Sequence, residues 1–523
     1  MGITGIPTST KVLIIGGGPA GSYCAAVLAR EGIEVTLLER EYFPRYHIGE
    51  SMLPSFNKFM SFIDAQEKVK KAKFVVKPGA AIKIDQHKRE GYTDFIAFDP
   101  ENSAWNLLRS EFDEILLRHA AECGAHVFEG VSVTDIQFSE KDSTQPISAS
   151  WSSKSRSRSG EISFDYLVDA SGRTGIMSTK YLKTRKFNES LRNVAWWGYW
   201  RGAGMYMPGT KRENAPWFEA LTDETGWAWF IPLHNGTVSV GVVLSEKSSR
   251  AKKEKIPVQD GVDRNIAHYL EQLKLAPNLL NLLGQAKFDG SLKTAGDYSY
   301  SSEHNHYAGP RYRIVGDAGA FIDPLFSSGV HLAFTGGLSA AATIAASIRS
   351  QCTEAEAAAF HNQKIGISYT RFLVVVWAAY KQMKAQSSPV LADVNEDNFD
   401  RAFDFLRPVI QGATESDPTL SEREVMEAME FCGHAMAPSD PEMLQSVSKR
   451  LDPKLLAFDG PLLTPRAVES MIGEDEEAKQ ALWKVNSDKA LVVMFDFKGN
   501  FRQEVINGLY VNLEKGSLGL VKA

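Results

Sequence analysis

The stretch KVLIIGGGPAG, from Lys11 to Gly21, decides the fold of this 523-residue chain. Its apolar half, Lys11 to Ile15, is typical of a buried strand, and the glycine-rich half predicts a tight turn. An alanine-rich helix is expected from Ser22 to Glu31, and a second strand from Glu34 to Leu38 ends in Glu39. This order of strand, turn, helix and strand predicts the βαβ unit that binds dinucleotides.

The three glycines of the turn have distinct roles in such a unit. Gly16, Gly18 and Gly21 stand at the spacing that lets the backbone turn sharply, approach a pyrophosphate and pack the helix on the strand. The phosphate then faces the positive end of the helix. At the end of the next strand, the carboxylate of Glu39 can accept hydrogen bonds from the ribose hydroxyls. A nicotinamide enzyme would satisfy the same pattern, so further residues are needed to choose the cofactor.

Three segments favour a flavin. Arg109 is expected on a helix from Trp105 to Ala121, the sequence DASGR at 169–173 closes a strand, and GDAG at 316–319 ends another. Taken singly, each has an ordinary explanation: a surface arginine, a capped strand end, a strand-to-helix turn. In this order and spacing they resemble the flavin monooxygenase superfamily. That resemblance implies FAD, with the arginine near its phosphates or ribityl chain and Asp317 near a ribityl hydroxyl.

A pair of tryptophans narrows the resemblance. In GWAWFIP, 226–232, the alternation of a strand puts Trp227, Trp229 and Ile231 on one face. Sheet core would explain a single tryptophan, but two tryptophans followed by Ile231-Pro232 resemble the WxWxIP signature of flavin-dependent halogenases. In that family the wall formed by these four residues keeps the organic substrate away from the flavin, so that the oxidant attacks a halide.

Lys77, within FVVKPGA at 74–80, is the candidate catalytic residue. Most lysines are solvated surface charges, and only the surrounding pattern, which resembles that of the halogenase lysine between flavin and substrate, distinguishes Lys77 from Lys73 or Lys83. A desolvated ammonium group can donate a hydrogen bond to hypochlorous acid, and the neutral amine can itself be chlorinated.

The segment DPLFSSGVH, 323–331, carries the candidate halide site. Unpaired amides at the N-terminus of a helix attract an anion, and Ser328 and Gly329 stand where the next helix is expected to begin. Helix capping by Ser327 or Ser328 is the simpler explanation, and both can hold at once.

One departure from the tryptophan-halogenase branch bears on the substrate. Those enzymes carry a glutamate just before the matching serine, whereas this chain has Phe326. A phenol needs less activation, because its oxygen already donates electron density to the ring. The segments 45–54 and 88–95 also resemble the fungal phenol and polyketide halogenases. The cofactor-binding residues that we expect are Gly16, Gly18, Ala20, Gly21, Glu39, Arg45, Ile48, Ser51, Arg109 and Asp317.

The predicted fold class is α/β (α+β) in three units. A Rossmann-like FAD-binding domain is expected from residues 1–55, 105–180 and 295–385. An interleaved antiparallel sheet for the substrate is expected from 56–104 and 181–294, where β-branched and aromatic residues alternate with polar ones. Residues 386–523 are acidic with punctuating prolines, and we expect a helical C-terminal region there.

Composition excludes several other classes of protein. The chain has 58 Lys and Arg against 64 acids, a net charge of −6, and no dense basic block, so nucleic acid is not an expected partner. Its four cysteines are scattered without a CxxC pair, which predicts no metal site and a reducing compartment. The uncharged stretch 326–347 holds a histidine and three glycines, so we expect a buried helix without membrane insertion. The N-terminus shows no cleavage site, and a cytoplasmic location is expected.

The resemblance implies an enzyme that uses FADH2, O2 and chloride to form hypochlorous acid. This electrophile would chlorinate an electron-rich phenolic, polyketide-like secondary metabolite of fungal type by electrophilic aromatic substitution. A separate flavin reductase would supply FADH2, because the chain shows no second glycine fingerprint for NADPH. Three alternatives stay open: an aromatic hydroxylase of the same superfamily, a reductase of the isoprenoid-saturating kind, and a flavin-bound sensor or scaffold without turnover.

Overall fold

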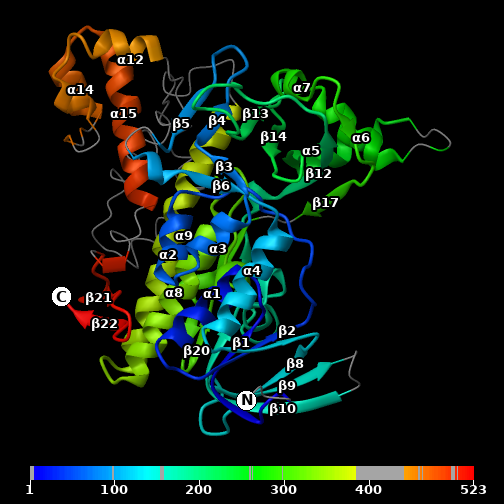
Figure 1. Cartoon of the computed structure of the whole chain (residues 1–523), viewed down its shortest axis with the longest axis vertical. Coiled ribbons are helices and arrows are strands. Elements are labelled where there is room, and N and C mark those ends of the chain that lie inside the picture. Colours follow the sequence, from blue (N-terminus) through cyan, green and yellow to red (C-terminus); the bar gives the residue numbers. More distant parts are fainter. Residues whose placement is uncertain are drawn as a thin grey trace.

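The computed structural model of the chain describes residues 5–523 apart from 97–98, 154–157, 258–260, 262, 297–298, 385–440, 458–459, 462, 464, 496–500 and 503. Residues 386–440 of the predicted C-terminal region therefore lie outside the described residues. Two large sheets, a pair of long helices and a group of C-terminal helices make up the described chain (Figure 1).

The first sheet is built on the βαβ unit that the glycine motif predicts. The unit consists of β1 (Ser9–Ile15), α1 (Pro19–Arg30) and β2 (Val35–Glu39). The strand order is β19-β20-β10-β1-β2-β7, and β20, β10, β1, β2 and β7 are parallel neighbours. The remaining strands of this sheet are β7 (His126–Glu129), β8 (Ser132–Phe138), β9 (Pro146–Ser153), β10 (Arg158–Asp169), β19 (Ala308–Gly309) and β20 (Tyr312–Ile314). Because parallel strands end at the same edge, Ile15, Glu39, Asp169 and Ile314 lie along one side of the sheet.

The second sheet contains the expected alternating strands. Its order is β16-β12-β15-β14-β13-β4-β5, with β17 also paired to β12. The strands are β4 (Gly79–Lys83), β5 (Gly91–Asp94), β12 (Asn193–Arg201), β13 (Trp217–Ala220), β14 (Gly226–Pro232), β15 (Thr237–Ser245), β16 (Lys287–Phe288) and β17 (Lys293–Gly296). The sheet is antiparallel except between β13 and β4, which are parallel. One face is covered by α5 (Glu246–Glu254), α6 (Arg264–Leu273) and α7 (Pro277–Leu283).

One predicted helix begins later than the sequence suggests. Trp105 lies in β6 (Ala104–Asn106), which pairs with β3 (Val75–Lys77), and α4 (Arg109–Glu122) starts only after Leu108, whose backbone is extended. The pairing with β3 competes successfully with the apolar spacing that predicted a helix here. Two short helices, α2 (Ser55–Phe62) and α3 (Gln66–Lys71), connect this part of the chain, and β11 (Arg185–Phe187) pairs with β18 (Tyr300–Ser302).

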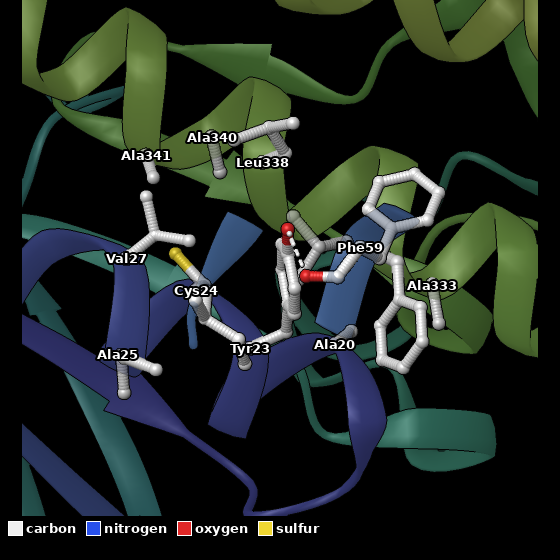
Figure 2. Packing of buried hydrophobic residues seen from close by; sticks show 14 of the residues in the cluster. Ala20, Tyr23, Cys24, Ala25, Val27, Phe59, Ala333, Leu338, Ala340 and Ala341 are labelled. Carbon is white, nitrogen blue, oxygen red and sulfur yellow. Dashed lines mark hydrogen bonds between the residues drawn. The ribbon is translucent and has the colours of Figure 1, made fainter. Parts of the chain in front are cut away.

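The small-residue helix α8 (Gly329–Ile348) packs directly against α1. A Cβ atom at Gly337 would lie 2.8 Å from the carbonyl oxygen of Ala20, so glycine permits this close approach. Figure 2 shows Tyr23 of α1 in this contact, where its hydroxyl donates a hydrogen bond to the carbonyl oxygen of Phe59 (3.2 Å). Among the described residues, α8 alone is long and apolar enough to cross a membrane, but 89% of its apolar window is buried inside the protein, as expected of a core helix.

A break in the backbone separates α8 from the long helix that follows it. Ser350 has a left-handed backbone (φ 56°), and α9 (Glu354–Met383) begins afresh with Thr353 and Glu356 capping each other's backbone amides. The helices α8 and α9 then run side by side through the middle of the molecule (Figure 1).

The C-terminal region contains the expected helices and also a hairpin. The helices are α12 (Pro441–Val447), α13 (Pro453–Leu456), α14 (Pro465–Ile472) and α15 (Glu476–Phe495). The hairpin of β21 (Leu509–Asn512) and β22 (Gly519–Lys522) was not expected from the sequence, and its buried Leu509, Val511 and Leu520 join the core formed by α1 and α8. The carbonyl oxygen of Leu518 accepts a hydrogen bond from Arg349, at the end of α8.

The core between α1, α2, α4 and α8 is centred on Phe334, whose ring is fully buried against Tyr23, Phe56, Phe59 and Phe112. We expect Phe334→Ala to lower the free energy of unfolding by about 3–5 kcal/mol, because it leaves a cavity in a close-packed core. The measurement is the midpoint of chemical denaturation. As a control, Leu270→Ala on α6, 36% exposed, should cost less than about 1 kcal/mol. Equal shifts for the two variants would contradict this description of the core.

Candidate functional site

A cavity of about 770 Å³ opens where the parallel strands of the first sheet end, and it extends to β14 of the second sheet. Of the predicted site residues, those that line it are Gly16, Gly18, Ala20, Glu39, Arg45, Ile48, Ser51, Arg109, Trp227, Trp229, Ile231, Asp317 and Gly329. Four other predicted residues, Gly21, Lys77, Pro232 and Ser328, lie outside its lining. Residues far apart in the sequence thus meet around one space of the size that cofactors occupy.

The glycine turn leaves bare backbone at the edge of this cavity. Gly16 has φ +104°, and a Cβ atom there would lie 2.3 Å from the carbonyl oxygen of Ala170. At Gly21 a Cβ atom would lie 2.0 Å from the carbonyl oxygen of Gly16, so this glycine, although outside the lining, lets α1 close on the strand. Gly18 is the N-cap of α1 and has no close neighbour except Arg45. Backbone amides at a helix N-terminus, open to a cavity, suit a pyrophosphate.

Glu39 organises this turn as well as lining the cavity. One carboxylate oxygen accepts a hydrogen bond from the amide of Gly17 (2.6 Å), and the other accepts one from the amide of Glu41 (2.8 Å). Each carboxylate oxygen has a second acceptor position. The side chain can therefore hold the turn and still accept a hydrogen bond from a ribose hydroxyl.

The two predicted cofactor arginines share one buried acid that the sequence analysis gave no role. Arg109 binds Asp113 in bidentate fashion (2.8 and 3.0 Å), and Arg45 donates to the same carboxylate (2.9 Å). Burial alone would raise the pKa of Asp113, but the charge of Arg109, aided by Arg45, outweighs it and holds that pKa below its usual range. Two guanidinium groups and one carboxylate leave one net positive charge beside the cavity, which suits a bound phosphate group.

The predicted indole wall stands at the other end of the cavity. The rings of Trp227 and Trp229 are 5.8 Å apart, and Trp197 of β12 adds a third indole 6.3 Å from Trp229. Both wall indoles are fixed by their N–H groups, that of Trp227 to the hydroxyl of Tyr380 (2.8 Å) and that of Trp229 to the hydroxyl of Ser239 (3.2 Å). The first two indoles were predicted from their alternation in one strand and from the WxWxIP resemblance, whereas Trp197 comes from a different strand.

Lys77 is buried in a small cavity of its own. Only 1% of its surface is exposed, and its amine donates to the hydroxyl of Ser51 (2.8 Å) and to the carbonyl oxygen of Met52 (2.8 Å). Burial lowers the pKa of Lys77 to about 7, so the amine changes charge near neutral pH. The cavity, of about 40 Å³, is lined by Leu53, Lys77, Ala80, Ile82, Thr93, Phe95, Phe218, Leu325, Phe326, Ser327, Phe372 and Val375.

The two cavities are neighbours. Phe218 and Ser327 line both of them, and Ser51 lines the large cavity while accepting a hydrogen bond from Lys77. Ser51, predicted as a cofactor residue, is therefore also the residue that fixes the lysine. Lys77 lies one side chain away from the large cavity without lining it.

The predicted halide turn, residues 327–329, lies between the same two cavities. Ser328 is the N-cap of α8, but its side chain makes no capping hydrogen bond, and it is buried outside both linings. Gly329 lines the large cavity and Ser327, with φ +56°, lines both. No side chain among the described residues therefore caps the start of this helix. Ser327, which was expected only as a possible cap, instead lines both cavities.

Glu50 is a lining residue whose importance the sequence did not reveal. It is 2% exposed, and one carboxylate oxygen accepts a hydrogen bond from the hydroxyl of Tyr199 (2.6 Å). The other oxygen is buried with no hydrogen-bond partner among the described residues. Burial raises the pKa of Glu50 to about 7, and this effect is opposed by the hydroxyls of Tyr199 and Ser239 and by the charge of Arg109. The resemblance of segment 45–54 to the fungal halogenases pointed to this part of the chain, but it did not single out the carboxyl group of Glu50.

Comparisons with known proteins agree on one family. A family model described as Tryptophan halogenase matches residues 11–98 and 96–417. The chain is 58% identical over 521 residues to the flavin-dependent halogenase armH1 of Armillaria mellea, covering 99% of each protein. It is 44% identical to sulochrin halogenase gedL of Aspergillus terreus, covering 99% of this chain and 94% of that protein. Among solved structures, the FAD-dependent chondrochloren halogenase CndH, from a myxobacterium, matches with a TM-score of 0.66 and 26% identity over 83% of this chain and 98% of that one.

The buried carboxyl of Glu50 should make stability depend on pH. Its pKa in the folded protein, about 7, lies above its ordinary value of 4.5, so its contribution to stability is fully present below that ordinary value and is lost as pH rises through 7. The groups acting on it are Tyr199, Ser239 and Arg109, and Tyr46 is hydrogen-bonded to Tyr199. Glu50→Gln copies the protonated form. Relative to wild type, it should therefore gain about 2–3 kcal/mol of stability between pH 5 and pH 8.

Thermal unfolding of wild type and Glu50→Gln, measured in parallel across that pH range, checks this expectation. The difference between the two proteins isolates Glu50 from all other titrating groups. A difference that is independent of pH would contradict the titration of Glu50 in this range.

Proposed function

This chain belongs to the family of flavin-dependent halogenases, and we propose that it chlorinates an electron-rich phenol with hypochlorous acid formed from reduced FAD, O2 and chloride. The observation that carries the proposal is the buried amine of Lys77, which lies next to the large cavity but outside it, across Ser51 and Phe218. If the electrophile forms in the large cavity and reacts in the small one, a hydrogen-bonding group is needed between them to hold it.

The residues of the large cavity fit FAD. The bare backbone of Gly16 and Gly18 at the start of α1 would hold the pyrophosphate. Glu39 would bind the ribose, and Arg45 and Arg109 would add positive charge near the phosphates. Ala20 and Ile48 would make van der Waals contacts with the cofactor, and the carboxylate of Asp317 would accept a hydrogen bond from a ribityl hydroxyl. When bound in its reduced form, FAD supplies the electrons that activate O2 for the oxidation of chloride.

Lys77 would hold hypochlorous acid against the ring to be chlorinated. Its ammonium form donates a hydrogen bond to the oxygen of hypochlorous acid, which makes that oxygen a better leaving group. A ring carbon then forms a bond to chlorine, the O–Cl bond breaks, and the ring loses its proton, so that the products are aryl chloride and water. With a pKa of about 7, Lys77 can also exchange the proton that this step requires.

The phenolic acceptor is supported by the lining of the Lys77 cavity. Apart from Lys77, Thr93 and Ser327, its lining side chains are apolar, and Phe326 stands where the tryptophan-halogenase branch is expected to carry a glutamate. Among the described residues no carboxylate lines this small cavity, so the acceptor has to supply its own electron density, as a phenol does. The similarity to sulochrin halogenase and to other fungal halogenases adds support to this substrate class.

The wall and the halide turn complete the proposal. Trp227, Trp229 and Ile231, followed by Pro232, would keep the acceptor from the flavin, which an aromatic hydroxylase would not require. The backbone amides of Ser328 and Gly329 would bind chloride, since they begin a long helix. We also infer that residues 1–55, 105–180 and 295–385 bind FAD, that 56–104 and 181–294 bind the acceptor, and that a separate flavin reductase supplies the reduced cofactor.

The test is an incubation with a flavin reductase, FAD, chloride and a panel of simple phenols, read by mass spectrometry. We expect products with the isotope pattern of chlorine that disappear when chloride is omitted. Products that gain oxygen instead, with or without chloride, would overturn the proposal in favour of hydroxylation.

In the same assay, Lys77→Met should lower chlorination by at least about 100-fold, because a positioned acid and hydrogen-bond donor is removed. Oxidation of reduced FAD should continue at nearly the wild-type rate. The matched control is Lys83→Met on β4, whose amine is also largely buried and donates to the carbonyl oxygen of Lys88. Full chlorination by Lys77→Met would remove this lysine from the reaction.

A further inference from the structure

The wall indole of Trp227 is held from behind by α9. Trp227 is 1% exposed, and its indole N–H donates to the hydroxyl of Tyr380, 2.8 Å away. Tyr380 lies near the C-terminal end of α9, 153 residues further along the chain. A hydrogen bond to a buried indole fixes the rotation of the ring, since turning it would leave the N–H unpaired.

The hydroxyl of Tyr380 connects four separate elements. Besides the indole N–H it accepts a hydrogen bond from the side-chain amide of Asn193 at the start of β12 (2.9 Å). It donates its own proton to a carboxylate oxygen of Asp323 (2.9 Å). These three bonds use the one donor and both acceptor positions of a phenol hydroxyl.

Asp323 carries the connection to the halide turn. Its other carboxylate oxygen accepts a hydrogen bond from the backbone amide of Leu325 (2.9 Å), which bends the chain two residues before Ser327. Asp323 is 1% exposed and lines the large cavity, and Ser327 lines both cavities. One phenol hydroxyl therefore ties the indole wall to the turn at the boundary between the cavities.

We propose that Tyr380 is a positioning residue for the barrier between the two cavities. By holding Trp227 and the 323–327 turn in one hydrogen-bond network, it keeps the indole packed on Phe218 (6.1 Å between rings) and Trp229. This proposal rests on the proposed function, because it assigns the barrier the task of directing the oxidant to chloride and Lys77. With a loose indole, reduced FAD and O2 would yield oxidised FAD and hydrogen peroxide without oxidising chloride.

Tyr380→Phe tests this role by removing one oxygen atom and little volume. The chlorinated product formed per molecule of reduced FAD oxidised should fall roughly fivefold, with the balance recovered as hydrogen peroxide. The affinity for FAD should not change. The matched control is Tyr369→Phe, a buried tyrosine on the same helix whose hydroxyl is influenced by the side chains of Ser299 and Ser301 and not by the wall. It should chlorinate as efficiently as wild type.

A second measurement reads the indole itself. In protein labelled with 5-fluorotryptophan, the fluorine signal of Trp227, assigned with Trp227→Phe, should shift or broaden in Tyr380→Phe and stay in place in Tyr369→Phe. An unchanged signal in Tyr380→Phe would overturn the positioning role. So would a changed signal in a variant that still forms as much chlorinated product per reduced FAD oxidised as wild type. A wild-type protein that oxidises reduced FAD without chlorinating would instead contradict the proposed function, and the fluorine signal would then decide by itself whether Tyr380 orders the wall.

Discussion

The burial of one amine constrains the whole site. Lys77 can stay buried only because its amine has two fixed oxygen partners, Ser51 and the carbonyl of Met52, and because its charge can be given up near neutral pH. Both partners belong to the segment that follows the glycine turn and Arg45, so the position of the lysine is set by the same segment that lines the large cavity. The distance between cofactor site and amine is therefore built into the fold.

The close contact of α1 and α8 also helps to fix the positions of the residues around the two cavities. Gly337 allows the approach, and α8 begins at the turn that separates the two cavities. Since the first residues of α1 and of α8 both line the large cavity, the packing of these two helices fixes the relative position of two parts of its lining. The second sheet then contributes the indoles, which are anchored by Ser239 within the sheet and by Tyr380 from α9.

The sequence predicted the parts of this site that depend on local spacing. The glycine turn and the alternation of Trp227 with Trp229 follow from backbone geometry over a few residues, and the lysine was found from its neighbours. Glu50 and Tyr380 could not be found in this way, because their partners lie 149 and 153 residues away and only the folded chain brings them together. The β6 strand was mistaken for helix for a similar reason, since its pairing partner β3 lies about 30 residues earlier.

Four buried groups around the cavities titrate close to neutral pH, and their effects on stability have opposite signs. Burial raises the pKa of Glu50 to about 7 and those of Asp317 and Asp323 to about 6, so their contribution falls as pH rises through these values. Burial lowers the pKa of Lys77 to about 7, so its contribution falls as pH decreases through 7. The combined contribution of these four groups to stability is therefore lowest near pH 7. At that pH each group can be protonated or deprotonated, so each can exchange a proton. A ligand that binds only the folded protein, as FAD is proposed to do here, would offset this loss of stability by mass action.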